Sequence, residues 1–202
     1  MVTLLVASNN LGKVREFQAL LEGLPFLLTT LKDAGINMAV DEVGSSYQEN
    51  AQLKAETYAC LSGQLTLADD SGLEVAALGG EPGPRAARYA GENASDRDRI
   101  DYLLAKLRNV PWEQRKARFC CVVALAIPGY GVEICRGECQ GYITLEPKGK
   151  KGFGYDPVFY LPDFGKTMAE LSLEEKNKIS HRAGAAKCAR AVLERWLEKT
   201  KP

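Results

Sequence analysis

Two adjacent aspartates, Asp69 and Asp70, are the residues of this sequence best suited to chemistry. They follow the apolar run 65–68 and precede Ser71 and Gly72, a pair typical of a turn. The end of a strand often carries functional side chains, because the strand holds them rigidly while the loop admits a ligand. Two neighbouring carboxylates repel each other, which favours a bound divalent cation or a raised pKa for one of them. A solvated surface turn is the alternative for this tetrapeptide alone.

A polar segment after the first expected strand could bind phosphate. It consists, in order, of Ser8, Asn9, Asn10, Leu11, Gly12 and Lys13. A helix that begins here presents free backbone N–H groups and the positive end of its dipole, and both favour a phosphate. The segment is not a P-loop, because Val14 replaces the Ser or Thr of that motif. A phosphate site and a simple capped turn both stay open.

Two later segments combine aromatic, glycine and basic residues. The first consists of Phe153, Gly154, Tyr155, Asp156 and Pro157, and the second of Ser180, His181 and Arg182, with Lys176 upstream. An aromatic ring can stack on a nucleobase, and a glycine lets the backbone approach a ligand closely. A histidine beside an arginine can contact a base edge or a phosphate. Taken singly, each segment is more typical of a surface loop or a solvated helix start.

Together, these signals favour nucleotide hydrolysis. The carboxylates that could hold Mg²⁺ are Asp41, Glu42, Asp69 and Asp70, and the cations that could neutralise phosphates are Lys13, Lys54, Lys176 and Arg182. Phe153 and His181 could hold a base. Metal and cations complement each other, because a metal alone leaves the phosphates under-neutralised and lysines alone activate no water.

The composition indicates a single globular domain over residues 1–202, with no nucleic-acid or membrane partner. Hydrophobic residues make up 46% of the chain, and 26 basic residues balance 26 acidic ones, which argues against a non-specific nucleic-acid coat. No apolar run is long enough to span a membrane, and the start of the chain lacks a basic region, so we expect a cytoplasmic protein. His181 is the only histidine, which excludes a histidine-based metal site. Most of the six cysteines should be buried, reduced packing residues, and Cys135 with Cys139 is the only suggestive pair.

Apolar periodicity and turn residues predict a mixed α/β fold. Strands are expected at 2–7, 26–31, 65–68 and 158–160, and a three-stranded antiparallel meander at 119–127, 132–138 and 141–145. Helices are expected at 12–22, 46–61, 95–108 and 183–198. Ser46 and Ser95 begin two of these helices as capping residues.

The ordered motifs closely resemble those of the inosine triphosphate pyrophosphatase family, which hydrolyses noncanonical purine nucleoside triphosphates. The matching segments are 8–13, 49–51 with Lys54, 68–73, 82–83 with 87–89, 153–157, 166–167 with 174–176, and 180–182. They span nearly the whole chain. Two departures are Asn9 and Lys151, which stand where many members have glycine, and neither removes a catalytic group.

The resemblance implies roles for particular residues. Asp70 would accept the proton of the attacking water, and Asp41 and Asp70 would bind Mg²⁺ with Glu42 and Asp69 in support. Ser8 to Lys13, Lys54, Ser71 and Lys176 would hold the triphosphate. Phe153 to Asp156, with His181 and Arg182, would recognise a 6-keto purine. The implied fold is an elongated two-lobed α/β structure with a mixed sheet and the active site in the cleft between the lobes, usually as a homodimer.

The resulting hypothesis is hydrolysis of ITP, dITP and XTP to the monophosphate and pyrophosphate, with Mg²⁺. A related septum-formation-type pyrophosphatase, acting on pyrimidine or modified nucleotides, is one alternative, and segments 153–157 and 180–182 disfavour it. A non-catalytic nucleotide- or RNA-binding module is another. The four clustered carboxylates disfavour this alternative, because they would repel the negatively charged nucleotide or RNA unless a metal ion intervened.

Overall fold

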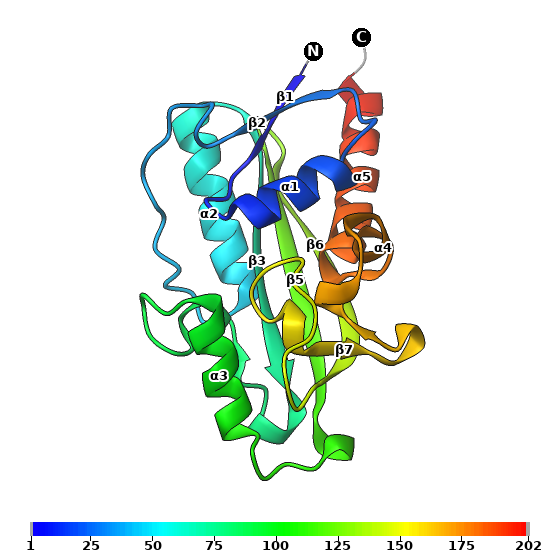
Figure 1. Cartoon of the computed structure of the whole chain (residues 1–202). Coiled ribbons are helices and arrows are strands. Elements are labelled where there is room, and N and C mark those ends of the chain that lie inside the picture. The colour runs from blue at the N-terminus through cyan, green and yellow to red at the C-terminus, as the bar shows by residue number, and fades with distance from the viewer. Residues whose placement is uncertain (1, 201–202) are drawn as a thin grey trace. The chain divides into compact units, whose positions relative to one another are not determined.

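The computed structural model describes residues 2–200 and confirms the mixed α/β architecture (Figure 1). The helices are α1 (Leu11–Leu20), α2 (Tyr47–Ser62), α3 (Asp96–Lys106), α4 (Leu173–Ile179) and α5 (His181–Thr200). The strands are β1 (Val2–Val6), β2 (Phe26–Thr30), β3 (Leu65–Val75), β4 (Pro82–Gly83), β5 (Lys116–Ile127), β6 (Gly131–Ile143), β7 (Phe159–Leu161) and β8 (Lys166–Thr167). They form one sheet in the order β2-β1-β3-β5-β6-β7-β8, with β4 beside β3.

The sheet is mixed, and the chain divides into two compact units. β1 runs parallel to both β2 and β3, whereas β7 is antiparallel to β6 and β8. Unit 1 contains the residues up to Asp70, Cys121–Gly137 and the residues from His181 onward. Unit 2 contains Ser71–Cys120 and Glu138–Ser180. β3, β5 and β6 each contribute residues to both units.

Unit 1 has helices on both faces of its strands. α1 and α5 pack on one face through a core that includes Phe17 and Leu193, together with Leu67 of β3. α2 packs on the other face, where Ala55 meets Ala68 of β3. Figure 1 shows α2 and α5 on opposite sides of β3. Alternate residues of β3 therefore face different helices, as the period of two in a strand requires.

In unit 2, α3 packs against residues of β3, β5 and β7. Ile100 and Leu103 of α3 share a core with Leu73, Phe119 and Phe159. The rings of Phe119 and Phe159 lie 4.3 Å apart, between centroids. This core includes Tyr155 and therefore holds the loop of the predicted site segment 153–157.

β6 and α4 are among the elements that differ from the sequence prediction. β6 is one continuous strand where two were expected, and Gly141 lies inside it. A Cβ atom at Gly141 would lie 2.5 Å from the carbonyl oxygen of Tyr160, so this glycine permits a close approach of backbone and does not mark a turn. α4 was missed, although Ser172 and Glu175 form the capping box that begins it.

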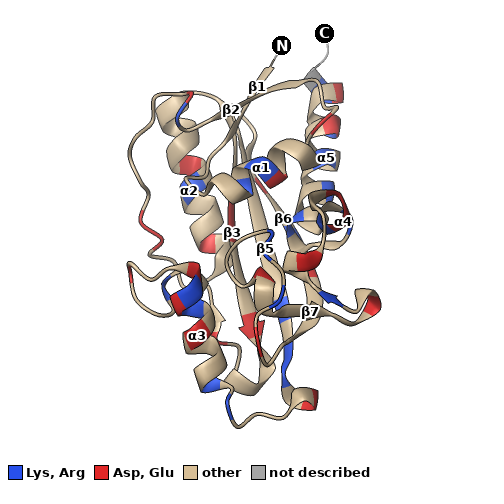
Figure 2. Cartoon of the chain, in the orientation of Figure 1, with Lys and Arg blue, Asp and Glu red and all other residues tan. Residues whose placement is uncertain are grey.

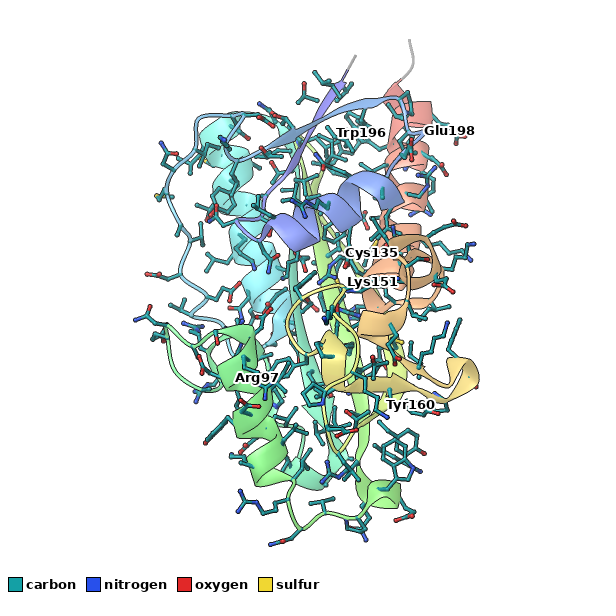
Figure 3. The ribbon with its side chains drawn as sticks, in the orientation of Figure 1. Arg97, Cys135, Lys151, Tyr160, Trp196 and Glu198 are labelled. Atoms are coloured by element: carbon teal, nitrogen blue, oxygen red, sulfur yellow. A yellow bond between two sulfur atoms is a disulfide. The ribbon has the colours of Figure 1, made fainter. Side chains whose placement is uncertain are left out.

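The cysteines partly follow the expectation. Cys120, Cys121 and Cys139 are buried free thiols. Cys135, labelled in Figure 3, is bonded to Cys188 of α5, so the expectation of reduced packing cysteines was wrong for these two. The partner lies 53 residues away along the chain, and spacing within a short segment could not identify it.

Within residues 2–200, we find no helix that is both long enough and apolar enough to cross a membrane.

Candidate active site

Asp69 and Asp70 lie in the middle of β3, and the predicted turn after them does not exist. The strand continues to Val75, and Figure 2 shows the acidic segment in the body of β3. Both carboxylates are buried, with 2% and 3% of the residue surface exposed. Because neighbouring side chains of a strand point to opposite faces, Asp69 points with Leu67 toward α1 and α5, and Asp70 points with Ala68 toward α2. The two aspartates therefore have different partners.

Asp69 belongs to a buried network of alternating charge in unit 1. The ammonium of Lys13 lies 2.9 Å from its Oδ2, and Nε of Arg182 lies 3.9 Å from the same oxygen. Arg182 also forms an ion pair through Nη1 with Glu16, and its guanidinium lies 5.8 Å from the ring centre of Phe17. The first residues of α1 and α5 are thereby fixed to β3.

This network determines the protonation state of Asp69. Burial acts to raise the pKa of Asp69, but the positive charges of Lys13, Arg182 and Lys54 outweigh it and lower the pKa to about 2, from an ordinary value of 3.8. The folded-state pKa is thus depressed. The stability that Asp69 contributes is present above pH 3.8 and is lost as the pH falls through about 2.

Replacing Asp69 with Asn should destabilise the protein strongly. The change leaves Lys13 and Arg182 without their shared carboxylate in a buried environment, and breaking a buried ion pair in this way costs about 3–5 kcal/mol. Urea unfolding at neutral pH measures the loss. The matched control is Asp101→Asn, which removes an exposed ion pair with Arg97 and should cost about 0.5 kcal/mol or less. Equal losses in the two variants would show that the network around Asp69 contributes nothing.

Asp70 is held on the other face by α2. Nδ2 of Asn50 donates a hydrogen bond of 3.0 Å to Oδ2 of Asp70, and Oδ1 of Asn50 accepts one of 2.8 Å from the backbone N–H of Gly44. Lys54, one turn further along α2, forms an ion pair with Glu42. Ser46 positions this helix, because its hydroxyl accepts from the N–H of Glu49 at the first turn.

The electrostatics of Asp70 are opposite to those of Asp69. Burial raises the pKa of Asp70 above its ordinary value, and the negative charge of Glu42 adds to this, while Lys54 opposes both. Burial acts to lower the pKa of Lys54, but Asp69, Glu42 and Asp70 outweigh it and raise that pKa. A carboxylate with a raised pKa beside a lysine that stays charged is suited to accept a proton.

The four predicted metal-binding carboxylates do not form one cluster. Asp41 is exposed, and Asp69 faces away from Asp70. Nowhere in residues 2–200 do three or more His, Cys, Asp or Glu side chains come close enough together to hold a metal ion. Asp70 and Glu42 are the two carboxylates whose charges interact on the α2 side.

Segment 8–13 forms a capped helix start. Oδ1 of Asn10 accepts hydrogen bonds from the N–H groups of Gly12 and Lys13, at 2.9 and 3.1 Å. The hydroxyl of Ser8 accepts from the N–H of Asn10. The side chains of Asn9 and Leu11 are exposed. The capped turn is therefore confirmed, and phosphate binding here stays a prediction.

In unit 2, Asp156 joins the predicted base-binding loop to α4. Its Oδ2 accepts hydrogen bonds from the N–H of Phe153, at 3.0 Å, and from Nζ of Lys176, at 2.5 Å. Lys176 also lies 4.9 Å from the ring centre of Phe153, which is a cation–π contact. Gly152 (φ +74°) must be glycine here, because a Cβ atom would lie 2.0 Å from Oδ2 of Asp156.

The other predicted residues of unit 2 have structural partners. The N–H of Gly154 donates to Asp96 of α3 at 2.7 Å. The hydroxyl of buried Tyr155 donates to the carbonyl oxygen of Ala86 at 2.9 Å, and burial raises the pKa of this tyrosine. Ser71 is half-buried in β3. These contacts fix the shape of the loop around Phe153.

The structure thus brings the predicted residues together in three groups. They are Lys13 with Asp69 and Arg182, Glu42 with Lys54 and Asp70, and Phe153 with Asp156 and Lys176. Sequence reasoning missed Glu16, Asn50 and Asp96 as partners of these groups. Asn50 lies one residue after the capping Glu49 and one turn before Lys54, and an amide on that face of a helix was the available signal.

The chain is similar to known proteins in both sequence and structure. A sequence model described as the Ham1 family matches residues 4–192. A protein named dITP/XTP pyrophosphatase from Bacillus licheniformis is 48% identical, over 96% of this chain and 99% of its own length. One of the same name from Thermus thermophilus is 48% identical, over 98% and 93%. The HAM1 protein structure from Coxiella burnetii has a TM-score of 0.87 and 42% identity, covering 96% of this chain and all of that one. The Staphylococcus aureus Ham1 structure has a TM-score of 0.84 and 42% identity, covering 95% and 98%.

Proposed function

Because the chain belongs to the Ham1 family, we propose that it hydrolyses noncanonical purine nucleoside triphosphates, namely ITP, dITP and XTP, to the monophosphate and pyrophosphate. The names of its relatives support the substrate class. The observation that carries the chemistry is Asp70, a buried carboxylate with a raised pKa, oriented by Asn50 beside the charged Lys54. The septum-formation-type and RNA-binding alternatives have no comparable support.

In this proposal Asp70 accepts the proton of a water that attacks the α-phosphorus. A base with a raised pKa is stronger than an ordinary carboxylate, and its fixed orientation removes the entropic cost of aligning it. The hydrogen bond from Asn50 to Oδ2 holds the carboxylate of Asp70 in one orientation. Attack at the α-phosphorus makes pyrophosphate the leaving group, which gives the two proposed products.

The residues on the α2 side fit a bound Mg²⁺. Asp70 and Glu42 supply the hard oxygen ligands that Mg²⁺ prefers, and Mg²⁺ in nucleotide sites is usually bound by one or two carboxylates plus substrate phosphates. A set of three protein carboxylates is therefore not required. Asp41, on the same segment as Glu42, is proposed as a further ligand, with Asp69 in support. When bound, the ion would neutralise phosphate charge and acidify water.

The cations of the three groups are proposed to bind the triphosphate. Lys54 and Lys13 neutralise phosphate charge from unit 1, with help from the polar side chains and N–H groups of segment 8–13. Lys176 is proposed to add a further positive charge, and the hydroxyl of Ser71 a hydrogen bond to phosphate. Because Lys13 and Lys54 already pair with Asp69 and Glu42, their side chains are ordered before substrate arrives, which lowers the entropic cost of binding.

The base is proposed to be read by segment 153–156 together with His181 and Arg182. The ring of Phe153 offers a stacking surface, and the Asp156 network fixes the loop that carries it. Arg182 is 1% exposed and already pairs with Glu16, so its main contribution in this proposal is to hold the start of α5, where His181 lies. We further propose that the protein acts as a homodimer.

Product analysis tests this proposal. Incubation of dITP with the protein and Mg²⁺ should give dIMP and pyrophosphate in equal amounts, separated by anion-exchange chromatography. Formation of dIDP and inorganic phosphate would show attack at the γ-phosphorus and overturn the proposal.

A further inference from the structure

Two carboxylates anchor the backbone on the two sides of Phe153. Oδ2 of Asp156 accepts a hydrogen bond of 3.0 Å from the N–H of Phe153, and Oδ2 of Asp96 accepts one of 2.7 Å from the N–H of Gly154. These N–H groups belong to the two peptide units that flank the Cα atom of Phe153, and each peptide unit is planar. Anchoring both units fixes the backbone dihedral angles of Phe153, and with them the direction in which its side chain leaves the backbone.

Asp96 comes from a different part of unit 2, 58 residues before Gly154 in the chain. It is the first residue of α3 and follows Ser95, which caps the helix. The hydroxyl of Ser95 accepts a hydrogen bond from the N–H of Asp98, and the N–H of Ser95 donates to the carboxylate of Asp98 at 2.9 Å. Because this capping box fixes the first turn of α3, the carboxylate of Asp96 is presented to Gly154 from an ordered helix start.

Arg99 holds the side chain of Asp96 in this direction. Its Nη2 forms an ion pair with Oδ1 of Asp96, while Oδ2 binds Gly154. Its Nη1 donates to the carbonyl oxygens of Ala87 and Ala94, at 2.9 and 2.7 Å. Only 18% of the Arg99 side chain is exposed, so water competes little with these contacts. Arg99 therefore joins the start of α3 to the loop that precedes it.

The same loop supports the predicted base-binding segment a second time. The hydroxyl of Tyr155 donates to the carbonyl oxygen of Ala86 at 2.9 Å. Ala86 is the residue before Ala87, whose carbonyl oxygen binds Arg99. Gly154 and Tyr155 are consecutive residues, and independent contacts hold both of them to the same part of unit 2.

We propose that Asp96 and Arg99 are positioning residues, which fix the ring of Phe153 in the orientation that distinguishes a 6-keto purine from a 6-amino purine. They act through the backbone of Gly154 and are not catalytic residues. The inference rests on the proposed function, which assigns Phe153 to the base. It adds the start of α3 to the recognition machinery, a segment that contains none of the residues predicted from the sequence.

The orientation of the ring matters more for selectivity than for binding in general. Stacking is tolerant, because every base has a π-face, so dITP and dATP can both stack on a displaced ring. A hydrogen bond to the edge of the base weakens steeply when its angle departs from linearity. A mobile ring therefore deprives dITP of the hydrogen bonds that favour it, whereas dATP has no such bonds to lose. Loss of Asp96 should reduce the difference between the two nucleotides.

Nucleotide selectivity of three variants tests the proposal. Asp96→Ala removes the acceptor for Gly154 and should lower the ratio of kcat/KM between dITP and dATP by at least about tenfold, mainly through dITP. Asp96→Asn keeps an acceptor for Gly154 and loses only the ion pair with Arg99, so it should retain more of the ratio. The matched control is Asp101→Ala, at an exposed carboxylate of α3 that pairs with Arg97, and it should leave the ratio unchanged.

Amide hydrogen exchange reports on the loop without substrate. Exchange of the Gly154 amide, followed by NMR, should be at least about tenfold faster in Asp96→Ala than in the wild type, because its hydrogen bond is lost. Circular dichroism and thermal unfolding establish that each variant is folded.

A folded Asp96→Ala variant with the wild-type ratio would overturn the inference, whatever its exchange rate. Equal losses for dITP and dATP would also overturn it, because a merely structural role lowers both rates alike. So would an equal fall of the ratio in Asp101→Ala. A wild type that hydrolyses neither nucleotide would instead overturn the proposed function itself, so the two failures can be told apart.

Discussion

Asp70→Asn should lower kcat by about 10²–10⁴-fold, the usual contribution of a positioned general base, and leave the fold intact. Asn has the same shape and keeps an oxygen that can accept the hydrogen bond from Asn50, so the local geometry is preserved. The variant loses the ability to accept a proton and the negative charge that would help to hold Mg²⁺. Steady-state pyrophosphate release from dITP measures the effect, and Asp101→Asn, at an exposed carboxylate outside the proposed site, is the control that should leave kcat unchanged.

The pKa of Asp70 adds two further readouts to this variant. Since burial raises that pKa above the ordinary 3.8, the wild-type rate should fall with decreasing pH at a midpoint above 3.8. A raised folded-state pKa also means that the ionised carboxylate disfavours folding as the pH rises through that pKa. Removal of its charge should therefore not lower the stability at neutral pH. A variant with near-normal kcat, or one that is inactive only because it is unfolded, would contradict the role of Asp70.

dITP should be hydrolysed with a kcat/KM about 10⁴–10⁵-fold higher than that for dATP, the ratio expected when a site hydrogen-bonds a group that the competitor lacks. The two substrates share the same sugar and triphosphate, so the difference reports on the base alone. A 6-keto purine presents an acceptor at position 6 and a donor at N1, and a 6-amino purine reverses both. Polar groups of the site would then be left unpaired.

The rigidity of the loop around Phe153 is what makes such discrimination possible. Asp156 binds both the N–H of Phe153 and the ammonium of Lys176, and Gly154 is tied to Asp96, so the loop cannot easily adapt to the wrong base. Initial rates at low substrate concentration give kcat/KM directly for each nucleotide. A ratio between dITP and dATP below about tenfold would show that the base is not read by hydrogen bonds.

The positions of the helices and strands were predicted from the sequence better than the surroundings of Asp69 and Asp70 were. Ser46 correctly marked the start of α2, since a capping serine acts within one turn of chain. The turn after Asp70 was wrong because Ser71 and Gly72 are typical turn residues, whereas here pairing with a neighbouring strand keeps the chain extended. Strand pairing depends on residues distant in sequence, and local preference does not reveal it.

The partners of each candidate residue could not be derived from the sequence for the same reason. Lys13 and Arg182 lie far apart in the chain, and only the packing of α1 and α5 on one face of β3 brings both to Asp69. Glu16 had no distinguishing signal, because an acidic residue in an amphipathic helix is ordinarily exposed. Its burial follows from the ion pair with Arg182.

The fate of the oxygen of the attacking water shows which phosphorus is attacked. The protein is incubated with dITP in water enriched in heavy oxygen, once with Mg²⁺ and once with Mg²⁺ and excess EDTA, and the products are examined by mass spectrometry. We predict Mg²⁺-dependent formation of dIMP that carries the heavy oxygen, together with unlabelled pyrophosphate. Heavy oxygen in pyrophosphate or phosphate, or no turnover of dITP in either sample, would contradict water attack at the α-phosphorus by this protein.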